Sequence, residues 1–261
     1  MNGLTISRGP GGLPGLDVHA GAWLALEEKG IVPDRLAGCS AGAITSAFQA
    51  AGMTAREFVG ILRALKTKDV VRKRIGWKAR VFWITHFLKS EPIKELLDKY
   101  LPESFAQLET PLSVSAARMD PGSSPGKLFT SGPNLRAAVQ ASASISGVWD
   151  YVEVDGHPYS DGGTTDAIIV PEDHKGHLLI LDPYRYKDYA KRDRNMISRL
   201  LANIDMYSQQ EREATRAQLK KDGTPYTYIR LPMGEASMLE FDHDLINRTF
   251  DMMMEKEGFG K

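Results

Sequence analysis

The chain has 261 residues, 42% hydrophobic and 25% charged, which is the composition of a globular protein long enough to bury a substantial core. Its 33 basic residues balance its 33 acidic residues, which argues against a globally basic nucleic-acid-binding protein. The single cysteine, Cys39, excludes an intramolecular disulfide and a multi-cysteine metal site. The sequence shows no secretory leader pattern and no run of 18 apolar residues, so we expect a cytoplasmic protein with no membrane span.

The first predicted elements are a strand, a glycine-rich loop and a helix. Residues 4–7 (L-T-I-S) predict a short strand. Residues 9–15 (G-P-G-G-L-P-G) are rich in glycine and proline, which is typical of a loop. Apolar residues then recur with helical spacing from 16 to 29, and Gly30 is suited to end that helix.

The next segment predicts a strand over residues 31–37, a sharp turn, and a helix of small residues over 43–51. The turn is G-C-S-A-G, with Ser40 at its centre. The two glycines leave room for backbone that a β-carbon would block, so the pattern indicates a nucleophile elbow that holds the serine hydroxyl at a helix N-terminus. The alternative is a plain Gly/Ser turn.

Two further helices flank a segment of unusual composition. A T-x-x-E capping box at residues 54–57 begins a helix that reaches residue 65, and Ser90 caps a helix that reaches residue 100. Between them, residues 66–88 hold seven basic residues and one acid before four large apolar residues, Phe82, Trp83, Ile84 and Phe87. We interpret this segment either as a surface that contacts an anionic membrane or as a solvated helix whose aromatic residues reach the core.

The second half of the chain continues to alternate strands with helices. Strands are predicted at 112–117, 127–130, 177–182 and 226–231, a hairpin with an Asp-Gly turn at 152–159, and helices at 134–143, at 193–221 and from Asp242 onward. This alternation predicts a layered α/β fold in which helices flank a central, mostly parallel sheet. No linker or repeat interrupts the pattern, so we expect one domain over residues 1–261.

Three short motifs stand out together, in chain order. They are G-G-L-P-G at residues 11–15, the elbow at 38–42 and D-G-G at 161–163. Jointly they resemble the patatin-like phospholipases, whose pattern is G-G-x-[RK]-G, G-x-S-x-G and D-G-[GA]. The resemblance extends over about residues 4–182 and implies the layered patatin-like fold for this motif-bearing core. Within this frame we expect residues 66–100 to form a cap or lipid-facing insertion, and 193–261 to add C-terminal helices and a strand.

The resemblance implies a serine acyl hydrolase that cleaves lipid esters, of phospholipase A or lysophospholipase type, through an acyl-enzyme intermediate. Ser40 would be the nucleophile and Asp161 its base, and the N–H groups of Gly11, Gly12 and Leu13 would form the oxyanion hole. A serine hydroxyl needs such a base at neutral pH, and partial desolvation would raise the proton affinity of the aspartate. The glycines that would support the elbow and the aspartate are Gly38, Gly42, Gly162 and Gly163.

No metal, organic cofactor or nucleic-acid partner is implied. The expected partners are a lipid or phospholipid ester and, at the periphery, an anionic membrane surface that Lys73, Arg74 and Lys78 would contact.

The chain departs from the family pattern in the glycine-rich loop, where Pro14 stands in place of the basic residue. Arg8, just upstream, is a candidate to supply that cation instead. The segment at 164–171 also lacks the asparagine-proline pair that often follows the family's aspartate. These departures motivate a second hypothesis, a catalytically inactive lipid-binding or interaction protein with the same fold.

Other classes of protein are less consistent with the motifs. The glycines at 9, 11 and 15 also fit a dinucleotide-binding turn of an NAD(P)-dependent oxidoreductase, with Glu27, Glu28 or Asp34 as ribose partners, but the two prolines remove amides that a pyrophosphate would use.

An α/β-hydrolase triad would take its base from one of the histidines after Asp161, namely His174, His177 or His243. In the α/β-hydrolase fold, however, the elbow comes later in the chain than it does here, where it follows only one strand–helix unit. Cys39 is the remaining nucleophile candidate, and we expect it to point into the sheet as a small apolar residue.

Overall fold

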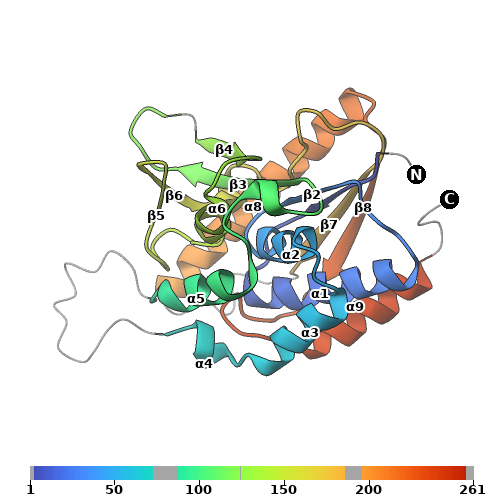
Figure 1. Ribbon diagram of the computed structural model, residues 1–261, viewed down its shortest axis with the longest axis horizontal. Coiled ribbons are helices and arrows are strands. Elements are labelled where there is room, and N and C mark those ends of the chain that lie inside the picture. Colours follow the sequence, from blue (N-terminus) through green and yellow to red (C-terminus); the bar gives the residue numbers. More distant parts are fainter. Residues whose placement is uncertain (1–2, 73–87, 124, 186–195, 257–261) are drawn as a thin grey trace.

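The computed structural model describes residues 3–72, 88–123, 125–185 and 196–256. Its centre is an eight-stranded sheet with the strand order β5-β6-β3-β2-β1-β7-β8, and β4 pairs with β3 (Figure 1). The parallel strands are β1 (Thr5–Arg8), β2 (Arg35–Gly38), β3 (Leu112–Arg118), β7 (Leu178–Tyr184) and β8 (Tyr226–Pro232). The antiparallel edge consists of β4 (Gly126–Phe129), β5 (Val152–Val154) and β6 (His157–Asp161). The predicted α/β architecture with a mostly parallel sheet is confirmed.

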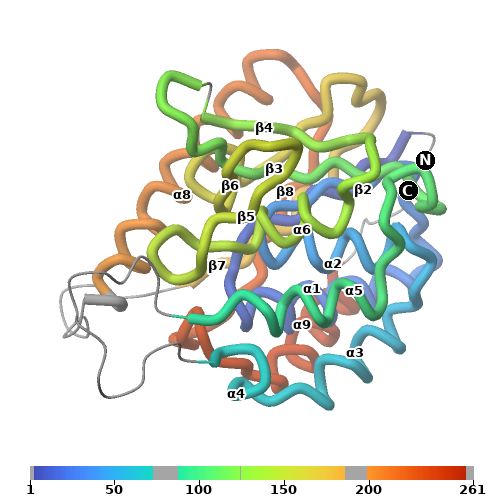
Figure 2. The backbone as a smooth tube through the Cα atoms, turned by 60° about the vertical axis from the view of Figure 1, so that its left-hand side comes forward, coloured from blue at the N-terminus to red at the C-terminus, as the bar shows by residue number. Residues whose placement is uncertain are grey.

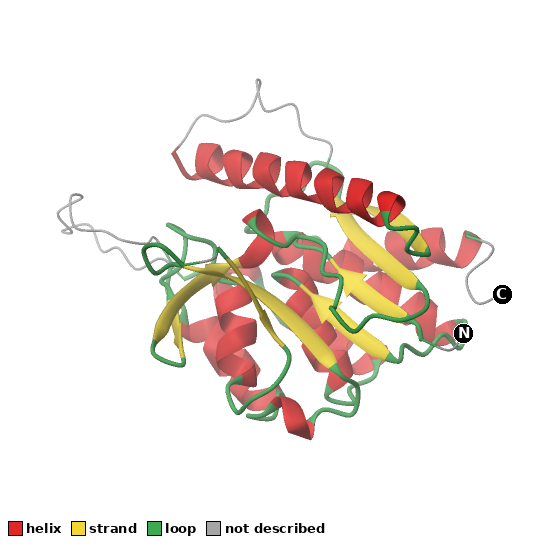
Figure 3. Cartoon of the chain, turned by 90° about the horizontal axis from the view of Figure 1, so that it is seen from above, coloured by secondary structure: helices red, strands yellow, loops and turns green. Residues whose placement is uncertain are grey.

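Helices cover both faces of this sheet. They are α1 (Gly12–Glu28), α2 (Ala41–Ala50), α3 (Ala55–Ala64), α4 (Thr67–Val70), α5 (Glu91–Tyr100), α6 (Leu135–Ser142), α8 (Met196–Lys221) and α9 (Asp244–Glu255), with 3₁₀ turns η2 (Phe105–Gln107) and η3 (Gly162–Thr164). Figure 3 shows the long helix α8 along one face and the cluster of shorter helices on the other. In the described part of the chain, no helix is long and apolar enough to cross a membrane.

The alternation of side chains along β7 explains why both faces are covered. Leu179 and Leu181 belong to the main core, whereas Leu178 and Ile180 pack with Leu219 of α8 in a second cluster. Successive strand residues point to opposite faces, so a strand that is apolar at every position needs a cover on each side. Helix α1 is central on the first face, where α9 lies along it (Figure 2), and it is buried on nearly all sides.

The starts of two elements differ from the sequence prediction by four residues. Helix α1 begins at Gly12 rather than residue 16, because Gly11 acts as its N-cap residue and Pro14 lies in the first turn, where its missing N–H costs nothing. Strand β2 begins at Arg35 rather than residue 31, because the Asp34 carboxylate instead accepts hydrogen bonds from the N–H groups of Gly3 and Leu4.

Local turn and cap chemistry accounts for several boundaries that are confirmed. The β5–β6 turn has positive φ at Asp155 and Gly156, as a type I′ hairpin requires. Thr54 caps α3 in a capping box with Glu57, and Gly30 ends α1. At α9, however, the N-cap residue is His243 and not the predicted Asp242.

The predicted membrane-contacting segment is described only in part. Residues 67–70 form α4 and residues 91–100 form α5. Residues 73–87, which include Lys73, Arg74 and Lys78 and the four large apolar residues, lie outside the described residues.

Candidate active site

The carboxyl ends of β1 and β2 bring two of the sequence motifs together. Arg8, the last residue of β1, pairs in register with Gly38, the last residue of β2. Because the two strands are parallel, the glycine-rich segment and the elbow leave the sheet at the same edge.

Ser40 lies on a strained turn between β2 and α2. Its φ of 54° and ψ of −121° are unusual for a residue with a β-carbon, at a typical cost of about 1–3 kcal/mol. A β-carbon on Gly38 would lie 2.3 Å from the Gly42 carbonyl oxygen, and one on Gly42 would lie 2.1 Å from the Arg8 carbonyl oxygen. The Ser40 N–H donates to Ser142 Oγ at 2.9 Å. The backbone therefore passes too closely here for any residue but glycine on either side of the serine.

Asp161 ends β6 and lies beside Ser40. Its N–H donates to the Ser144 carbonyl at 2.9 Å, and its Oδ1 accepts the Gly163 N–H at 2.8 Å. Oδ2 is buried and has no partner of ordinary hydrogen-bond geometry among the described residues. Burial raises the pKa of Asp161 from 3.8 to about 6, although the neighbouring Ser40 hydroxyl and the Gly163 N–H both lower it. Asp161 is thus a carboxylate with raised proton affinity next to the strained serine.

The glycine-rich segment presents unpaired backbone donors at the start of α1. Within the described chain, the N–H groups of Gly11 and Gly12 have no acceptor. The Leu13 N–H, in contrast, donates to the Met238 carbonyl at 2.9 Å, so it is occupied and does not serve as the predicted third oxyanion donor. Unpaired N–H groups at a helix N-terminus attract negative charge.

A further donor is Ala41, which sequence reasoning missed. Ala41 is the first residue of α2, and its N–H has no acceptor in the described part of the chain. The signal was present in the sequence, because the residue after an elbow nucleophile commonly supplies an oxyanion donor.

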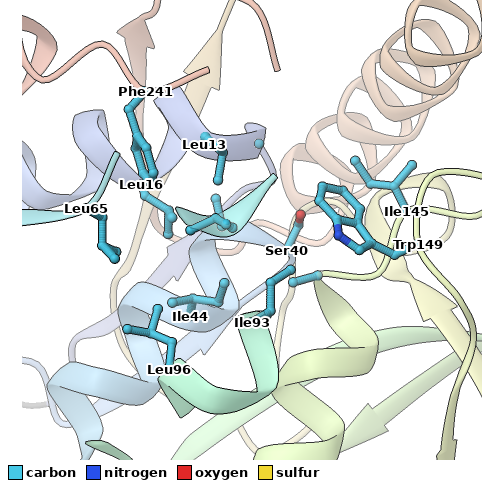
Figure 4. Close-up of a pocket in the computed structure, with 14 residues that line it drawn as sticks. Leu13, Leu16, Ser40, Ile44, Leu65, Ile93, Leu96, Ile145, Trp149 and Phe241 are labelled. Atoms are coloured by element: carbon cyan, nitrogen blue, oxygen red, sulfur yellow. The ribbon is translucent and has the colours of Figure 1, made fainter. Parts of the chain in front are cut away.

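An apolar pocket opens onto Ser40. It holds about 520 Å³ of empty space, part of it open to solvent. Figure 4 shows Ser40 among apolar side chains, with Ile145 and Trp149 on one side and Ile44 and Leu96 on another. The remaining lining residues are Gly12, Leu13, Leu16, Ala41, Leu65, Val70, Ile93, Ala143 and Phe241. Among the described lining residues, Ser40 carries the one hydroxyl.

The three candidate histidines, His174, His177 and His243, make their hydrogen bonds with residues other than Ser40 and Asp161. His174 Nδ1 lies 2.9 Å from Thr5 Oγ1 and His177 Nε2 lies 2.8 Å from Thr227 Oγ1, near the amino ends of parallel strands and so at the sheet edge opposite Ser40. His243 Nδ1 lies 2.8 Å from the Asp17 carboxylate.

The residues on which the cysteine-nucleophile and dinucleotide-binding hypotheses depend are buried or already hydrogen-bonded. The Cys39 thiol is fully buried next to Ala37 and Ile169, which raises its pKa well above the usual range. Two of the three predicted ribose partners are engaged by backbone, Glu27 with the Ala55 N–H at 3.0 Å and Asp34 as described above. Within the described ranges, no three metal-binding side chains gather into a site.

Arg8 does not replace the missing loop cation. Its guanidinium is buried between α1 and α2, where it donates to Ser46 Oγ at 3.1 Å and Gln49 Oε1 at 2.6 Å. Among the described residues, a different cation reaches the glycine-rich segment: Arg212 of α8 donates to the Pro10 carbonyl at 3.2 Å. No local sequence signal identifies this residue, because the contact joins positions 202 residues apart.

The comparisons with known proteins agree with the motifs. Residues 11–173, more than half of the chain, match the model of the patatin-like phospholipase family. Uncharacterized NTE family proteins of Mycobacterium bovis and Mycobacterium tuberculosis are each 30% identical over 186 residues, which is 63% of this chain and 44% of theirs. The chain therefore spans less than half the length of these curated relatives. The crystal structure of VipD from Legionella pneumophila has a similar fold, with a TM-score of 0.54 at 13% identity over 97% of this chain and 66% of VipD.

Proposed function

We propose that this chain, which belongs to the patatin-like phospholipase family, is a serine hydrolase of lipid acyl esters that acts through Ser40 and Asp161. One observation carries the proposal: a serine on a strained turn lines an apolar pocket and lies next to a buried carboxylate of raised pKa. Strained backbone and perturbed pKa values concentrate at functional sites, and here both occur at one point.

In the proposed mechanism, Asp161 takes the proton of the Ser40 hydroxyl as the oxygen attacks the ester carbonyl. The resulting oxyanion is stabilised by the N–H groups of Gly11, Gly12 and Ala41. Asp161 then protonates the departing alcohol, which leaves an acyl group on Ser40. Water, deprotonated by the same carboxylate, attacks this acyl-enzyme and releases a fatty acid and the free serine.

The apolar lining of the pocket favours a substrate whose long acyl chain binds there. Its walls are mostly apolar side chains from α1, α2, α5, the α3–α4 segment and the segments after α6 and β8. A hydrocarbon chain that enters the pocket would therefore bury its apolar surface against apolar side chains. Each buried methylene contributes about 0.8 kcal/mol. We therefore favour phospholipids and lysophospholipids as substrates, which the chain would take from a membrane surface. The activity would be of phospholipase A or lysophospholipase type.

The test is hydrolysis of a fluorogenic phospholipid in mixed vesicles by the purified chain and by three variants. We expect turnover by the wild type, its loss in Ser40→Ala and Asp161→Asn, and its retention in Cys39→Ala, which changes the adjacent residue. Turnover that persists in Ser40→Ala would refute the assignment. Vesicle binding without turnover of phospholipids or short-chain p-nitrophenyl esters would instead support the second hypothesis, an inactive lipid-binding protein, which the altered segment after Gly163 motivates.

A further inference from the structure

Helix α8 contacts both backbone segments of the site from the face of the sheet that it covers. It lies outside residues 11–173, the part that matches the family. Ser208 Oγ donates to the carbonyl of Gly163, two residues after Asp161, and Arg212 donates to the carbonyl of Pro10, directly before the oxyanion glycines. One turn of one helix therefore contacts both segments whose relative position the proposed mechanism depends on.

Arg212 is fixed in place by buried partners. It is 7% exposed, and its Nε lies 2.8 Å from Asp182 Oδ1 on β7. The Tyr228 hydroxyl of β8 donates to the other oxygen of the same carboxylate. Because the guanidinium is buried and its Nε forms an ion pair with the Asp182 carboxylate, its Nη2 donates to the Pro10 carbonyl from a defined position.

The geometry of a peptide bond transmits this contact to the oxyanion donors. In a trans peptide the carbonyl of Pro10 and the N–H of Gly11 share one plane and point in opposite directions, and the described chain has no cis peptide. Holding the Pro10 carbonyl toward α8 therefore turns the Gly11 N–H away from α8. The pocket lies on that side, because it is lined by Gly12 and Ser40 and by no described residue of α8.

The next carbonyl upstream is also held, but from α1. His19 is fully buried, which lowers its pKa to about 3 and keeps the imidazole neutral, and its Nε2 lies 2.8 Å from the Gly9 carbonyl. Pro14 in the loop carries no charge that could take over this task. The orientation of the segment thus depends on contacts from both faces of the sheet.

We infer that Arg212 is a positioning residue that aims the Gly11 N–H at the oxyanion, acting through the Pro10 carbonyl and not through the substrate. The inference rests on the proposed function and adds a residue from outside the matched region to its machinery. It predicts an effect on the transition state and little effect on ground-state lipid binding.

The test compares Arg212→Met with Arg216→Met. Arg216 lies one turn further along α8, and its guanidinium lies 4.2 Å from the centre of the Tyr228 ring. Its replacement removes an arginine that packs on the same helix but makes no hydrogen bond to the glycine-rich loop among the described residues. Removal of one oxyanion donor costs about 100- to 1,000-fold in kcat, so we expect misorientation in Arg212→Met to lower kcat by about 10- to 100-fold with KM nearly constant. Arg216→Met should retain the wild-type kcat, and Arg212→Lys should recover part of the loss.

Two inhibitors separate positioning from packing. A trifluoromethyl ketone, which forms a tetrahedral adduct with Ser40, should bind more weakly to Arg212→Met, whereas a product fatty acid should bind as it does to the wild type. Equal kcat in folded Arg212→Met and Arg216→Met would overturn the inference. If Arg212→Met does not fold, Arg212→Lys decides the matter, and a wild-type kcat in that variant is the overturning result.

Amide hydrogen exchange distinguishes a failed inference from a failed function. The peptide that spans residues 9–15 should exchange faster in Arg212→Met than in Arg216→Met, and this readout needs no substrate. An unchanged exchange rate overturns the positioning role even in an active enzyme. A wild-type protein that hydrolyses no ester, but in which the exchange rate responds to Arg212→Met, refutes the proposed function alone.

Discussion

Replacing Asp161 with asparagine should make the protein more stable at alkaline pH while it removes activity. Burial raises the pKa of the carboxyl from 3.8 to about 6, which means that the folded protein disfavours the charged form. At about 1.4 kcal/mol per pKa unit, the shift corresponds to about 3 kcal/mol. Asparagine has nearly the same shape and no charge, and its side-chain oxygen can still accept the Gly163 N–H, so the variant should avoid this cost.

The sign of the effect depends on pH. Between pH 3.8 and about 6 the folded state keeps a proton that the unfolded state has lost, so the wild type loses stability as the pH rises through this window. Above about pH 6 the wild type has lost the full stability difference that this carboxyl contributes, and below pH 3.8 it has lost none. The advantage of Asp161→Asn should therefore be about 3 kcal/mol at pH 8 and about half of that at pH 5.

Thermal unfolding at pH 8 and at pH 5 measures this difference. With an unfolding entropy of about 2.1 cal/mol/K per residue, about 3 kcal/mol raises the Tm of this chain by about 5 °C. Asp251→Asn, an exposed position on α9, controls for the change in net charge. A variant that gains nothing at pH 8, or gains the same amount at both pH values, would show that Asp161 is not a carboxylate held at the cost of stability.

Three other predictions follow from the site. The kcat/KM of the wild type should fall about tenfold per pH unit below about pH 6, because protonated Asp161 cannot accept the Ser40 proton, and a profile flat to pH 4.5 would contradict its role as base. Leu96→Trp should fill part of the pocket and shift the preference of hydrolysis toward esters of short acyl chains. The relative rate should change by about fourfold for each methylene that no longer fits. If the rates for acyl chains of increasing length are unchanged, the acyl chain binds elsewhere. Gly42→Ala should lower the free energy of unfolding in urea by about 3 kcal/mol or more, whereas Gly60→Ala, with no atom within 4 Å of the added carbon, should raise it by up to about 1 kcal/mol. Equal effects of the two alanines would refute the close approach of Gly42 to Arg8.

The features that could be predicted from the sequence are those that local chemistry determines. The elbow could be recognised because a β-carbon added at Gly38 or Gly42 would lie only 2.1–2.3 Å from a carbonyl oxygen, so neither position tolerates a side chain. The end of α1 at Gly30 and the Asp155–Gly156 turn follow from the same local demand for positive φ. Each of these signals lies within a few residues of its effect.

The parts that could not be predicted depend on partners far away in the chain. Leu13 looked like an oxyanion donor, but the carbonyl that occupies its N–H belongs to Met238, 225 residues later. Arg8 looked like the substitute cation, but its neighbours in space are Ser46 and Gln49, and the loop instead meets Arg212. Such pairings are decided by the packing of whole helices on the sheet, which no local pattern records.

Peptide mapping of a covalent adduct tests the central claim most directly. The purified protein is treated with a fluorophosphonate, digested and analysed by mass spectrometry, alongside Ser40→Ala and Asp161→Asn. We expect one adduct, on Ser40, that forms more slowly in Asp161→Asn and is absent from Ser40→Ala. An adduct on Cys39 or on another serine, with hydrolysis retained in Ser40→Ala, would contradict the claim that this hydroxyl is the nucleophile.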